Sequence, residues 1–408
     1  MRTLDFTTEE LCQDSRMRIA LVTETWPPEV NGVAMTLARM VDGLIQRGHR
    51  VQLVRPRQTP TDTAISAGGL EEVLSRGLQL PRYDGLKLGL PARARLIREW
   101  SRQRPDLVHV ATEGPLGWTA VSAAKKLRLP VTSDFHTNFD HYSTHYGVGW
   151  LRQPVAAYLR RFHNRTAATY VPTAELAGIL TAQGYARVEV ISRGVDTTLF
   201  SPAHRSQALR RQWGVSPHGL AVICVGRVAP EKNLGLALRA FAAIRAHRPE
   251  ARMVVVGDGP MREAIAREQP DVVLAGMRHG EDLAAHYASA DLFLFPSLTE
   301  TFGNVTLEAM ASGLGVVAYA YAAAAEHMRD LDNGAVVRSG DESAFIERAL
   351  QLACADALRV DLGQAARRTA ERIDWARVND SFADALTRAW RADRVAAPML
   401  SSAFSGRV

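Results

Sequence analysis

Short apolar runs alternate along this chain with longer segments in which apolar and polar residues mix at helical spacing. The first apolar run is 18–23, a helical segment follows at about 35–47, and a second apolar run occupies 51–55. Runs of strand length separated by helices are typical of βαβ units, because two parallel strands need a long crossover connection. The pattern therefore predicts an α/β fold with parallel sheets.

The same alternation starts again at 221–225, after a polar turn at 193–196. A chain of 408 residues is long enough for two domains that each bury a core. We expect a first domain at 17–196, a second at 197–377 and a C-terminal helical segment at 378–408. Residues 1–16 have neither a basic start nor an apolar core, which predicts a disordered tail rather than a signal peptide and leaves Met17 as an alternative start.

The composition is that of a soluble globular protein, with 47% hydrophobic and 23% charged residues. No apolar run reaches the roughly 18 residues that a membrane-spanning helix needs. Cys12, Cys224 and Cys354 are isolated and show no metal-ligand or disulfide spacing, and Cys224 lies in an apolar strand, where we expect it to be core. These features predict a cytoplasmic protein.

The positive charge is concentrated in the first half of the chain. Residues 17–196 hold 23 Lys and Arg against 15 Asp and Glu, whereas residues 197–408 hold 24 of each. A basic domain suggests an anionic partner, either a membrane surface or nucleic acid. Because no zinc-finger, RNP or other recognition motif is present, the sequence favours an anionic membrane surface and no nucleic acid.

Two segments carry this charge together with large apolar side chains. Residues 87–104 hold six basic residues against Glu99, interleaved with Leu90, Leu96, Ile97 and Trp100. Residues 141–165 are aromatic and basic without an acid. Each segment is typical of a membrane-interface helix, and equally of a helix that covers a sheet and exposes a basic outer face.

The most informative stretch is 291–318, which reads as a strand, a polar loop and a helix. Glu300 lies in the loop and Glu308 follows eight residues later in the helix. In parallel sheets, ligands bind beyond the carboxyl ends of strands, and helix starts offer free N–H groups to anions. Carboxylates accept hydrogen bonds from sugar hydroxyls, so the stretch suits a sugar nucleotide whose phosphates contact backbone near Gly303 and Asn304. For an arbitrary pair of glutamates, a solvated helix residue and a charge near the helix start would be the commoner interpretation.

Two cations flank the loop that follows the strand at 221–225. Arg227 and Lys232 lie on either side of Pro230 at the strand's carboxyl end. One cation about 4 Å from a phosphate charge is worth roughly 4 kcal/mol at an effective dielectric constant near 20. Two such residues can hold a diphosphate without a metal ion.

Two positions in the first half also follow strands. Gly32, after a Pro-rich loop, lies where the backbone approaches a phosphate or sugar, although an Asn-Gly pair is more often simply a turn. No G-x-G-x-x-G motif is present, which argues against a nicotinamide enzyme. His136 follows the strand at 131–133, on the side of the sheet where catalytic residues gather.

These motifs together resemble the family-4 retaining glycosyltransferases. The resemblance rests on Gly226–Asn233, on Glu300 and Glu308 with seven residues between them, and on Phe-His-Thr-Asn-Phe at 135–139, and it extends over about 17–390. It implies two facing Rossmann-like domains with a cleft between them, the GT-B fold, and a last helix that crosses back to the first domain. The first domain would bind the acceptor and the second the sugar nucleotide.

The resemblance also implies roles for individual residues. Arg227 and Lys232 would stabilise the departing diphosphate, Glu308 would bind the ribose, Glu300 the sugar hydroxyls, and His136 the transferred hexose. No protein nucleophile is implied, because in this family the leaving phosphate is thought to take the acceptor's proton. The full donor-binding set is Gly32, Arg227, Lys232, Gly276, Met277, Glu300, Thr301, Phe302, Gly303, Asn304, Val305 and Glu308, and the catalytic set is His136, Glu300, Arg227 and Lys232.

Donor and acceptor follow from finer likenesses. The segments 111–117 and 135–139 look most like those of bacterial GDP-mannose-dependent α-mannosyltransferases and diacylglycerol glycosyltransferases, which implies GDP-mannose as donor and a lipid or glycan acceptor. UDP-glucose or UDP-glucuronate is the alternative donor. A sugar-nucleotide 2-epimerase and a non-catalytic membrane-binding module are alternatives from other classes. Such an enzyme would be peripheral on the inner face of the plasma membrane.

A metal-binding motif of other glycosyltransferases also occurs in this chain. Asp330-Leu331-Asp332 spells D-x-D, but Asn333-Gly334 and a short strand follow it. We interpret it as a turn, and we expect no metal or other cofactor to be required.

Overall fold

The computed structural model describes residues 16–29, 32–59, 61–79, 87–136 and 152–402, with side chains through 395. These residues form two compact units. Unit 1 contains the residues up to Ser192 together with Ala376 onward, and unit 2 is Arg193–Trp375. Residues 1–15 of the predicted tail at 1–16, and residues 141–151 of the aromatic segment at 141–165, lie outside the described residues.

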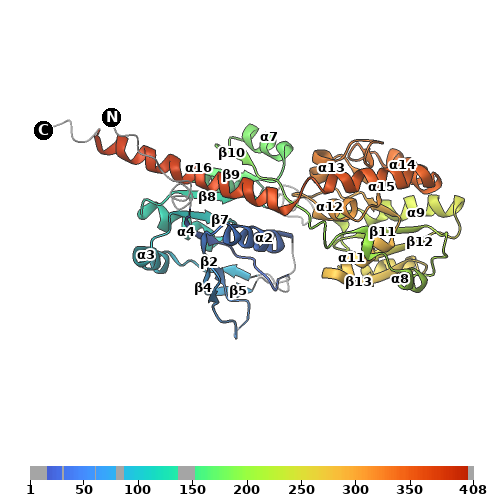
Figure 1. The fold of residues 1–408 in the computed structure, drawn as a ribbon, viewed down its shortest axis with the longest axis horizontal. Helices are drawn as coiled ribbons and strands as arrows, with labels where there is room; N and C mark the ends of the chain where they lie inside the picture. The colour runs from blue at the N-terminus through green and yellow to red at the C-terminus, as the bar shows by residue number, and fades with distance from the viewer. Residues whose placement is uncertain (1–15, 30–31, 60, 80–86, 137–151, 403–408) are drawn as a thin grey trace, which may run out of the picture. The chain divides into compact units, whose positions relative to one another are not determined.

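Unit 1 is built on a sheet with the strand order β10-β9-β8-β7-β1-β2-β4-β3 (Figure 1). All neighbours are parallel except β3 and β4. The strands are β1 Arg18–Val22, β2 Arg50–Pro56, β3 Ser66–Ala67, β4 Leu70–Ser75, β7 Leu107–Val110, β8 Val131–Asp134, β9 Ala168–Val171 and β10 Val188–Val190, and a separate antiparallel pair is β5 Gly77–Gln79 with β6 Lys87–Gly89.

Helices cover this sheet. They are α2 Gly32–Gln46, α3 Arg93–Arg102, α4 Pro115–Lys126, α6 Arg152–His163, α7 Ala174–Ala182 and α16 Trp375–Ser402. Phe382 of α16 packs edge-on against His109 of β7 and Tyr170 of β9, so the last helix lies on the sheet of unit 1.

The apolar face of α3 belongs to the core. Leu96 and Trp100 are 1% and 0% exposed, and the Trp100 indole donates to Gln52 of β2 at 2.9 Å. The interpretation in which these two side chains enter a membrane interface is therefore wrong. The alternative holds for them: α3 covers the sheet and turns Arg93, Arg98 and Arg102 outward.

Unit 2 is built on a parallel sheet with the order β13-β12-β11-β14-β15-β16. Its strands are β11 Ala221–Val225, β12 Arg252–Val256, β13 Val273–Gly276, β14 Leu292–Phe295, β15 Gly315–Tyr319 and β16 Ala335–Val337. Its helices are η2 Pro202–His204, α8 Gln207–Gln212, η3 Pro230–Lys232, α9 Leu234–His247, α10 Arg262–Glu268, α11 Gly280–Ser289, α12 Asn304–Ala311, α13 Ala322–His327, α14 Glu342–Cys354 and α15 Asp356–Ala370.

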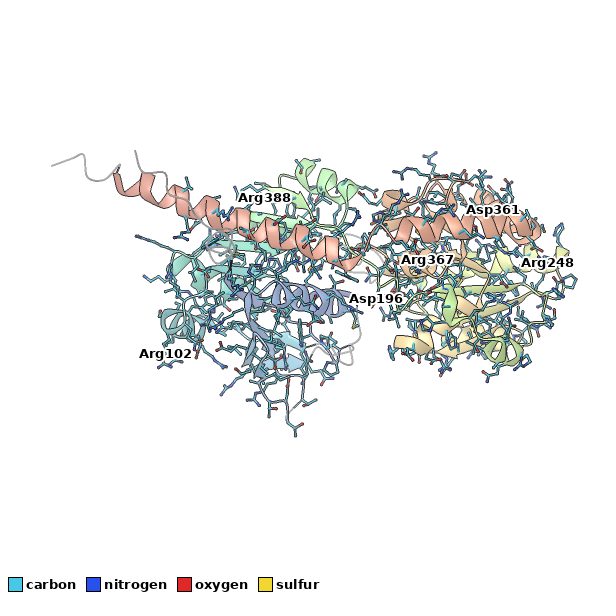
Figure 2. All side chains as sticks on the ribbon, viewed as in Figure 1. Arg102, Asp196, Arg248, Asp361, Arg367 and Arg388 are labelled. Atoms are coloured by element: carbon cyan, nitrogen blue, oxygen red, sulfur yellow. The ribbon has the colours of Figure 1, made fainter. Side chains whose placement is uncertain are left out.

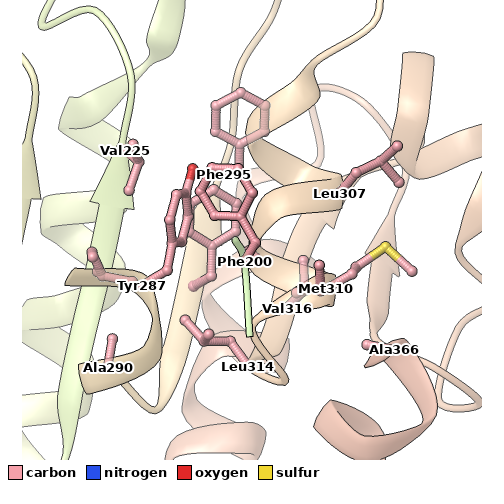
Figure 3. Close-up of a cluster of buried hydrophobic side chains, with 14 of the residues drawn as sticks. Phe200, Val225, Tyr287, Ala290, Phe295, Leu307, Met310, Leu314, Val316 and Ala366 are labelled. Atoms are coloured by element: carbon pink, nitrogen blue, oxygen red, sulfur yellow. The ribbon is translucent and has the colours of Figure 1, made fainter. Parts of the chain in front are cut away.

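The strands of unit 2 are apolar on both faces because helices cover both. Ala221, Ile223 and Val225 of β11 pack in the cluster that contains Tyr287 and Phe295, drawn in Figure 3. Val222 and Cys224 face the other cluster, with α9 and α14. Successive side chains of a strand point to opposite faces, so a continuous apolar run is what a doubly covered strand requires. Burial raises the pKa of the Cys224 thiol to about 12, as expected for the predicted core residue.

Both sheets reverse their strand order at one point. In unit 1 the chain builds β1, β2 and β4 outward in one direction and then β7 to β10 in the other, and unit 2 does the same about β11 and β14. Ligands of such sheets bind beyond the carboxyl ends of the strands at the reversal. The predicted α/β class with parallel sheets is confirmed, and each unit has the doubly wound order of a Rossmann-like domain.

Candidate active site

The loop after β11 carries the two predicted cations of unit 2. Gly226 follows the strand with a φ of +146°, and Pro230–Lys232 forms the short 3-10 helix η3. Asn233 ends this turn in the left-handed region, with φ 50° and ψ 41°, a conformation that asparagine tolerates better than most residues. The turn and its end fix the direction in which Lys232 leaves the backbone.

Two glycines of the neighbouring loop hold this loop against the sheet. A Cβ on Gly257 would lie 1.9 Å from the carbonyl oxygen of Gly226, and one on Gly259 would lie 2.4 Å from that of Val228. Backbone groups occupy the space that side chains would take, and Val228 N–H donates to the Asp258 carbonyl at 2.9 Å. Glycine is therefore required at both positions by a close backbone approach.

Lys232 and Glu300 form the centre of the site in unit 2. The Lys232 ammonium ion-pairs with Glu300 Oε1, and the Ser297 hydroxyl donates to the same oxygen at 2.8 Å. The Lys232 nitrogen also lies 5.8 Å from the centre of the Phe295 ring. The Glu231 carbonyl accepts from Leu298 N–H at 3.1 Å, which ties the loop after β11 to the loop after β14. The reversal point of the sheet therefore brings together residues 68 positions apart.

Arg227 is the more accessible of the two cations. Its side chain is 43% exposed and lies 3.5 Å from Glu231 Oε1, at the long end of an ion-pair contact. Lys232 is 19% exposed and already paired with a carboxylate. An incoming diphosphate would therefore find Arg227 partly solvated and Lys232 already oriented.

Glu308 has a separate partner. The Tyr287 hydroxyl donates to Glu308 Oε2 at 2.9 Å, and the Tyr287 ring is fully buried in the core beside Phe200, with its hydroxyl oxygen drawn in red in Figure 3. Burial raises the pKa of Glu308 to about 7, although the hydrogen bond from Tyr287 lowers it. At neutral pH this carboxyl is therefore close to its titration midpoint.

The next predicted residues of the sugar-nucleotide site lie at the start of α12. Gly303, the residue before the first residue of α12, has a φ of 84°, and no side chain caps the helix there. Phe302 is 4% exposed and belongs to the core, and Val305 packs against the core, so backbone groups are what these two positions can offer a ligand. Thr301 and Asn304 are partly exposed at the same helix start.

Gly276 and Met277 lie at the end of β13, two strands from the loop after β11. Gly276 has a φ of +74°, and its carbonyl accepts from Gly257 N–H at 2.9 Å. Met277 is 51% exposed. Both residues thus lie at the carboxyl end of the sheet, and their predicted contact with the donor remains a prediction.

His136 lies in unit 1 and is 4% exposed. Its Nε2 lies 3.0 Å from Asp134 Oδ2, and Nε2 of His109 lies 3.3 Å from the same oxygen. Burial of Asp134 opposes its ionisation, but the two histidines outweigh burial and hold the pKa of Asp134 well below its ordinary range. His136 is thus oriented by a buried, ionised carboxylate.

Gly32, the other predicted residue of unit 1, is the first residue of α2. It is exposed, and its carbonyl accepts from the Thr36 hydroxyl at 2.7 Å. Its contact with a donor remains a prediction.

A second buried carboxyl of unit 1 lies at the end of β1. Glu24 Oε1 accepts from Leu116 N–H at the start of α4 at 2.9 Å, and a Cβ on Gly114 would lie 2.0 Å from Glu24 Oε2. Burial raises the pKa of Glu24 to about 7, more than its backbone hydrogen bonds lower it. Its ionisation therefore opposes folding.

We predict a pH-dependent stability from this group. A carboxyl with a folded-state pKa near 7 and an ordinary value of 4.5 binds more protons folded than unfolded between these values, so its contribution is largest below 4.5 and is lost as pH rises through 7. The free energy of unfolding of Glu24→Gln, measured relative to the wild type, should therefore be higher at pH 8 than at pH 4.5 by about 2 to 3 kcal/mol. Denaturation curves at both pH values test this, and Glu175→Gln, at an exposed position of α7, serves as control. Equal pH dependence in wild type and Glu24→Gln would contradict it.

The D-x-D segment is a turn, as predicted. Asp330 Oδ2 pairs with Arg348 at 2.7 Å, and Asp330 Oδ1 accepts from Val336 N–H at 3.0 Å. Among the residues that the structure describes, no group of three or more His, Cys, Asp or Glu side chains is placed to hold a metal ion. No helix in the described part of the chain combines the length and apolarity needed to cross a membrane.

Three side chains at these sites were not predicted. Asp134 precedes His136 by two residues, and in an extended strand end such residues share a side, which was a usable signal. Ser297 stands three residues before Glu300 in the same loop. Tyr287 gives no local signal, because it reaches Glu308 only through the packing of α11 against α12.

The chain forms two doubly wound parallel sheets. At the reversal point of one sheet, a loop that carries two cations meets a loop that carries a carboxylate. These features define a nucleotide-binding protein of the Rossmann class. A family model described as "Glycosyltransferase Family 4" matches residues 30–199, and one described as "Glycosyl transferases group 1" matches 219–354. A GDP-mannose-dependent alpha-mannosyltransferase of Mycolicibacterium smegmatis is 36% identical over 307 residues, 74% of this chain and 79% of that protein. The chain belongs to the family-4 glycosyltransferases and is an enzyme of that class.

Two further likenesses concern the substrate class and the fold. An alpha-monoglucosyldiacylglycerol synthase of Streptococcus pneumoniae is 27% identical over 318 residues, 74% of this chain and 71% of that protein. The structure of sucrose-phosphate synthase from Thermosynechococcus elongatus superposes with a TM-score of 0.77 at 18% identity, over 92% of this chain and 100% of that one. The predicted family and its GT-B fold are confirmed.

Proposed function

We propose that this enzyme transfers mannose from GDP-mannose to a membrane glycolipid or diacylglycerol, with retention of configuration. The relative with 36% identity is named a GDP-mannose-dependent alpha-mannosyltransferase, and that likeness carries the choice of donor. The relative named for diacylglycerol supports a lipid acceptor. Because its name also specifies a glucosyl group, UDP-glucose is the second candidate donor, and UDP-glucuronate is tested beside it.

The proposed roles divide between the domains, taken as 17–196 for the acceptor and 197–377 for the donor, with the helix in 378–408 returning to the first. Arg227 and Lys232 neutralise the diphosphate, and Glu300, held by Lys232 and Ser297, accepts from the sugar hydroxyls. Glu308 accepts from the ribose, and Gly276 and Met277 lie beside the base. His136 contacts the hexose, and Gly32 approaches the donor with its backbone. The leaving phosphate takes the acceptor's proton.

We further propose that the enzyme works in the cytoplasm, peripherally on the inner face of the plasma membrane and without a metal. Outward arginines of α3 and the basic residues Arg160 and Arg161 of α6 would face anionic headgroups. Arg227 and Lys232, the two cations of the loop after β11, can balance a diphosphate, which carries about two charges.

The test is sugar transfer from GDP-mannose, UDP-glucose and UDP-glucuronate, each with and without diacylglycerol liposomes, in the presence of a chelator. Mannosyl lipid formed from GDP-mannose is the expected product. Glucosyl lipid from UDP-glucose would replace the proposed donor, and a strict metal requirement would refute metal-free transfer. Binding of every donor without transfer to lipid would refute the lipid acceptor and direct the search to a soluble glycan.

A separate prediction concerns Glu308. Glu308→Ala removes charged hydrogen bonds worth about 1.5 to 3 kcal/mol, so donor affinity should fall roughly ten- to a hundredfold. Since ribose hydroxyls donate best to the ionised carboxylate, whose pKa is about 7, donor affinity of the wild type should also fall as pH drops from 8 to 6, by about tenfold. Calorimetric titration with the donor at both pH values measures both effects.

Glu308→Gln and Glu281→Ala are the controls for this prediction. The first keeps the size but cannot titrate, so its donor affinity should not change between pH 6 and 8. The second removes an exposed glutamate at the start of α11, the helix that carries Tyr287, and should bind donor like the wild type. Unchanged affinity in Glu308→Ala would remove Glu308 from the nucleotide site.

A further inference from the structure

A hollow of about 470 Å³ lies in unit 1 beside the strand β4. It is lined by both charge signs, including three arginines, and by Ser75 near the end of that strand. Its volume falls in the range of small-molecule sites. It shares no residue with the candidate active site.

The acidic residues of the hollow are largely neutralised from behind. Glu71 pairs with Arg18 at 2.6 Å, and Glu72 accepts two hydrogen bonds from Arg55, both at 2.9 Å. Neither Arg18 nor Arg55 lines the hollow. The lining itself holds three arginines and three glutamates, and Arg55 also pairs with Asp62 at 2.6 Å. With Arg18, Arg55 and Asp62 included, five arginines face four acids, so the cluster carries one net positive charge.

Two of these arginines donate hydrogen bonds to neutral backbone carbonyls, which orient them without neutralising their charge. Arg95 Nη1 donates to the Leu74 carbonyl at 2.6 Å, and Arg57 Nη1 donates to the Asp62 carbonyl at 3.1 Å. A guanidinium has five N–H donors, so one bond to a neutral carbonyl orients it and leaves the others for an anion. Within the described residues, no carboxylate pairs with Arg76.

The wall of the hollow contains an unsatisfied polar group. Ser75 is 4% exposed, and its hydroxyl oxygen has no hydrogen-bond partner among the described residues. A buried hydroxyl without a partner costs roughly 1 to 3 kcal/mol, so a ligand in the hollow that bonds to this oxygen would recover that cost.

We propose that this hollow binds a phosphorylated polyol. The phosphate would accept from Arg57, Arg76 and Arg95, and a polyol hydroxyl would bond to Ser75 and donate to Glu99. A bare phosphate fills only part of such a volume, which is why the ligand carries a polyol. Its source is either a soluble glycerol phosphate or the headgroup of a phosphoglycerol lipid.

Calorimetric titration of the full-length protein with sn-glycerol 3-phosphate and with inorganic phosphate tests the proposal. The titrations are made in the Arg227→Ala background, which weakens phosphate binding at the donor site. Arg76→Gln should weaken glycerol phosphate binding about tenfold, the loss of one charge-assisted hydrogen bond. Ser75→Ala should weaken it about fivefold without lowering the thermal midpoint, because the hydroxyl it removes is unsatisfied in the free protein.

Two further variants sharpen this test. Glu99→Gln should tighten binding of inorganic phosphate, since it removes the repelling charge. Arg102→Gln changes an exposed arginine on α3, labelled in Figure 2, that does not line the hollow, and it should bind like its parent. The proposal is overturned if Arg76→Gln and Ser75→Ala bind like their parent, or if Arg102→Gln loses as much affinity as Arg76→Gln.

Vesicles distinguish the two sources. Sedimentation with phosphatidylcholine vesicles, with and without phosphatidylglycerol, is compared for the parent protein, Arg76→Gln and Arg102→Gln. A binding increment from phosphatidylglycerol that Arg76→Gln loses and Arg102→Gln keeps identifies a lipid headgroup. Calorimetric binding of glycerol phosphate without that increment identifies a soluble ligand, and failure of both assays refutes the site.

Discussion

Lys232→Ala is expected to lower kcat/KM for sugar transfer by about a thousandfold. The ammonium that it removes is worth roughly 4 kcal/mol to a phosphate charge about 4 Å away at an effective dielectric constant near 20. The same change leaves Glu300, whose side chain is 15% exposed, without its ion-pair partner at the reversal of the sheet. Steady-state kinetics with the donor that proves active measures the loss.

The controls for Lys232→Ala separate charge from folding. Lys232→Arg keeps the charge and should retain more activity than the alanine variant, though less than wild type, because a planar guanidinium differs from an ammonium in shape. Arg239→Ala removes an exposed cation of α9 that pairs with Glu342, and its activity should not change. An active Lys232→Ala enzyme with an unchanged thermal midpoint would exclude Lys232 from the diphosphate site.

The parts of the fold that sequence predicted are those with a local cause. Apolar runs such as 221–225 are bounded by glycine and followed by helices, and a strand buried on both faces has to be apolar throughout. The motif around Arg227 and Lys232 could be recognised because the 3-10 turn and the left-handed Asn233 depend on adjacent residues. Chain pattern and local backbone chemistry were sufficient there.

The contacts that complete the site have no local cause. Lys232 meets Glu300 because β11 and β14 are neighbours in the sheet, although β12 and β13 lie between them in sequence. The pairing of Tyr287 with Glu308 depends in the same way on how two helices pack on one sheet face. Spacing along the chain gives no measure of either distance.

The helix α3 shows a second limit of prediction from sequence. Its apolar face fits a membrane interface and a sheet equally well, because both remove side chains such as Leu96 and Trp100 from water. Only the neighbouring strand decides between them, and the bond from Trp100 to Gln52 shows that the sheet covers this face. An amphipathic pattern identifies a buried face without identifying what buries it.

Asp134→Asn is expected to lower both stability and activity, because Asp134 is buried between two histidines that share one of its oxygens. Replacing this carboxylate by an amide removes charge-assisted contacts worth about 1.5 to 3 kcal/mol each. The pKa of Asp134 is held below its ordinary value, so the stability it contributes is present at neutral pH and is lost as pH falls below about 4. Denaturation of the variant at pH 7 should show the full loss, and at pH 3 a smaller one.

The activity of this variant tests whether Asp134 acts through His136. We expect Asp134→Asn and His136→Gln each to lower kcat by about a hundredfold, the size of a misoriented catalytic contact, and the double variant to be no slower than either. His109→Gln breaks the other contact of Asp134, inside β7, and should lower stability while leaving kcat unchanged at temperatures where it is folded. Multiplying effects in the double variant would mean that Asp134 stabilises unit 1 without positioning His136, because two residues that act as a unit cannot lose the same contribution twice.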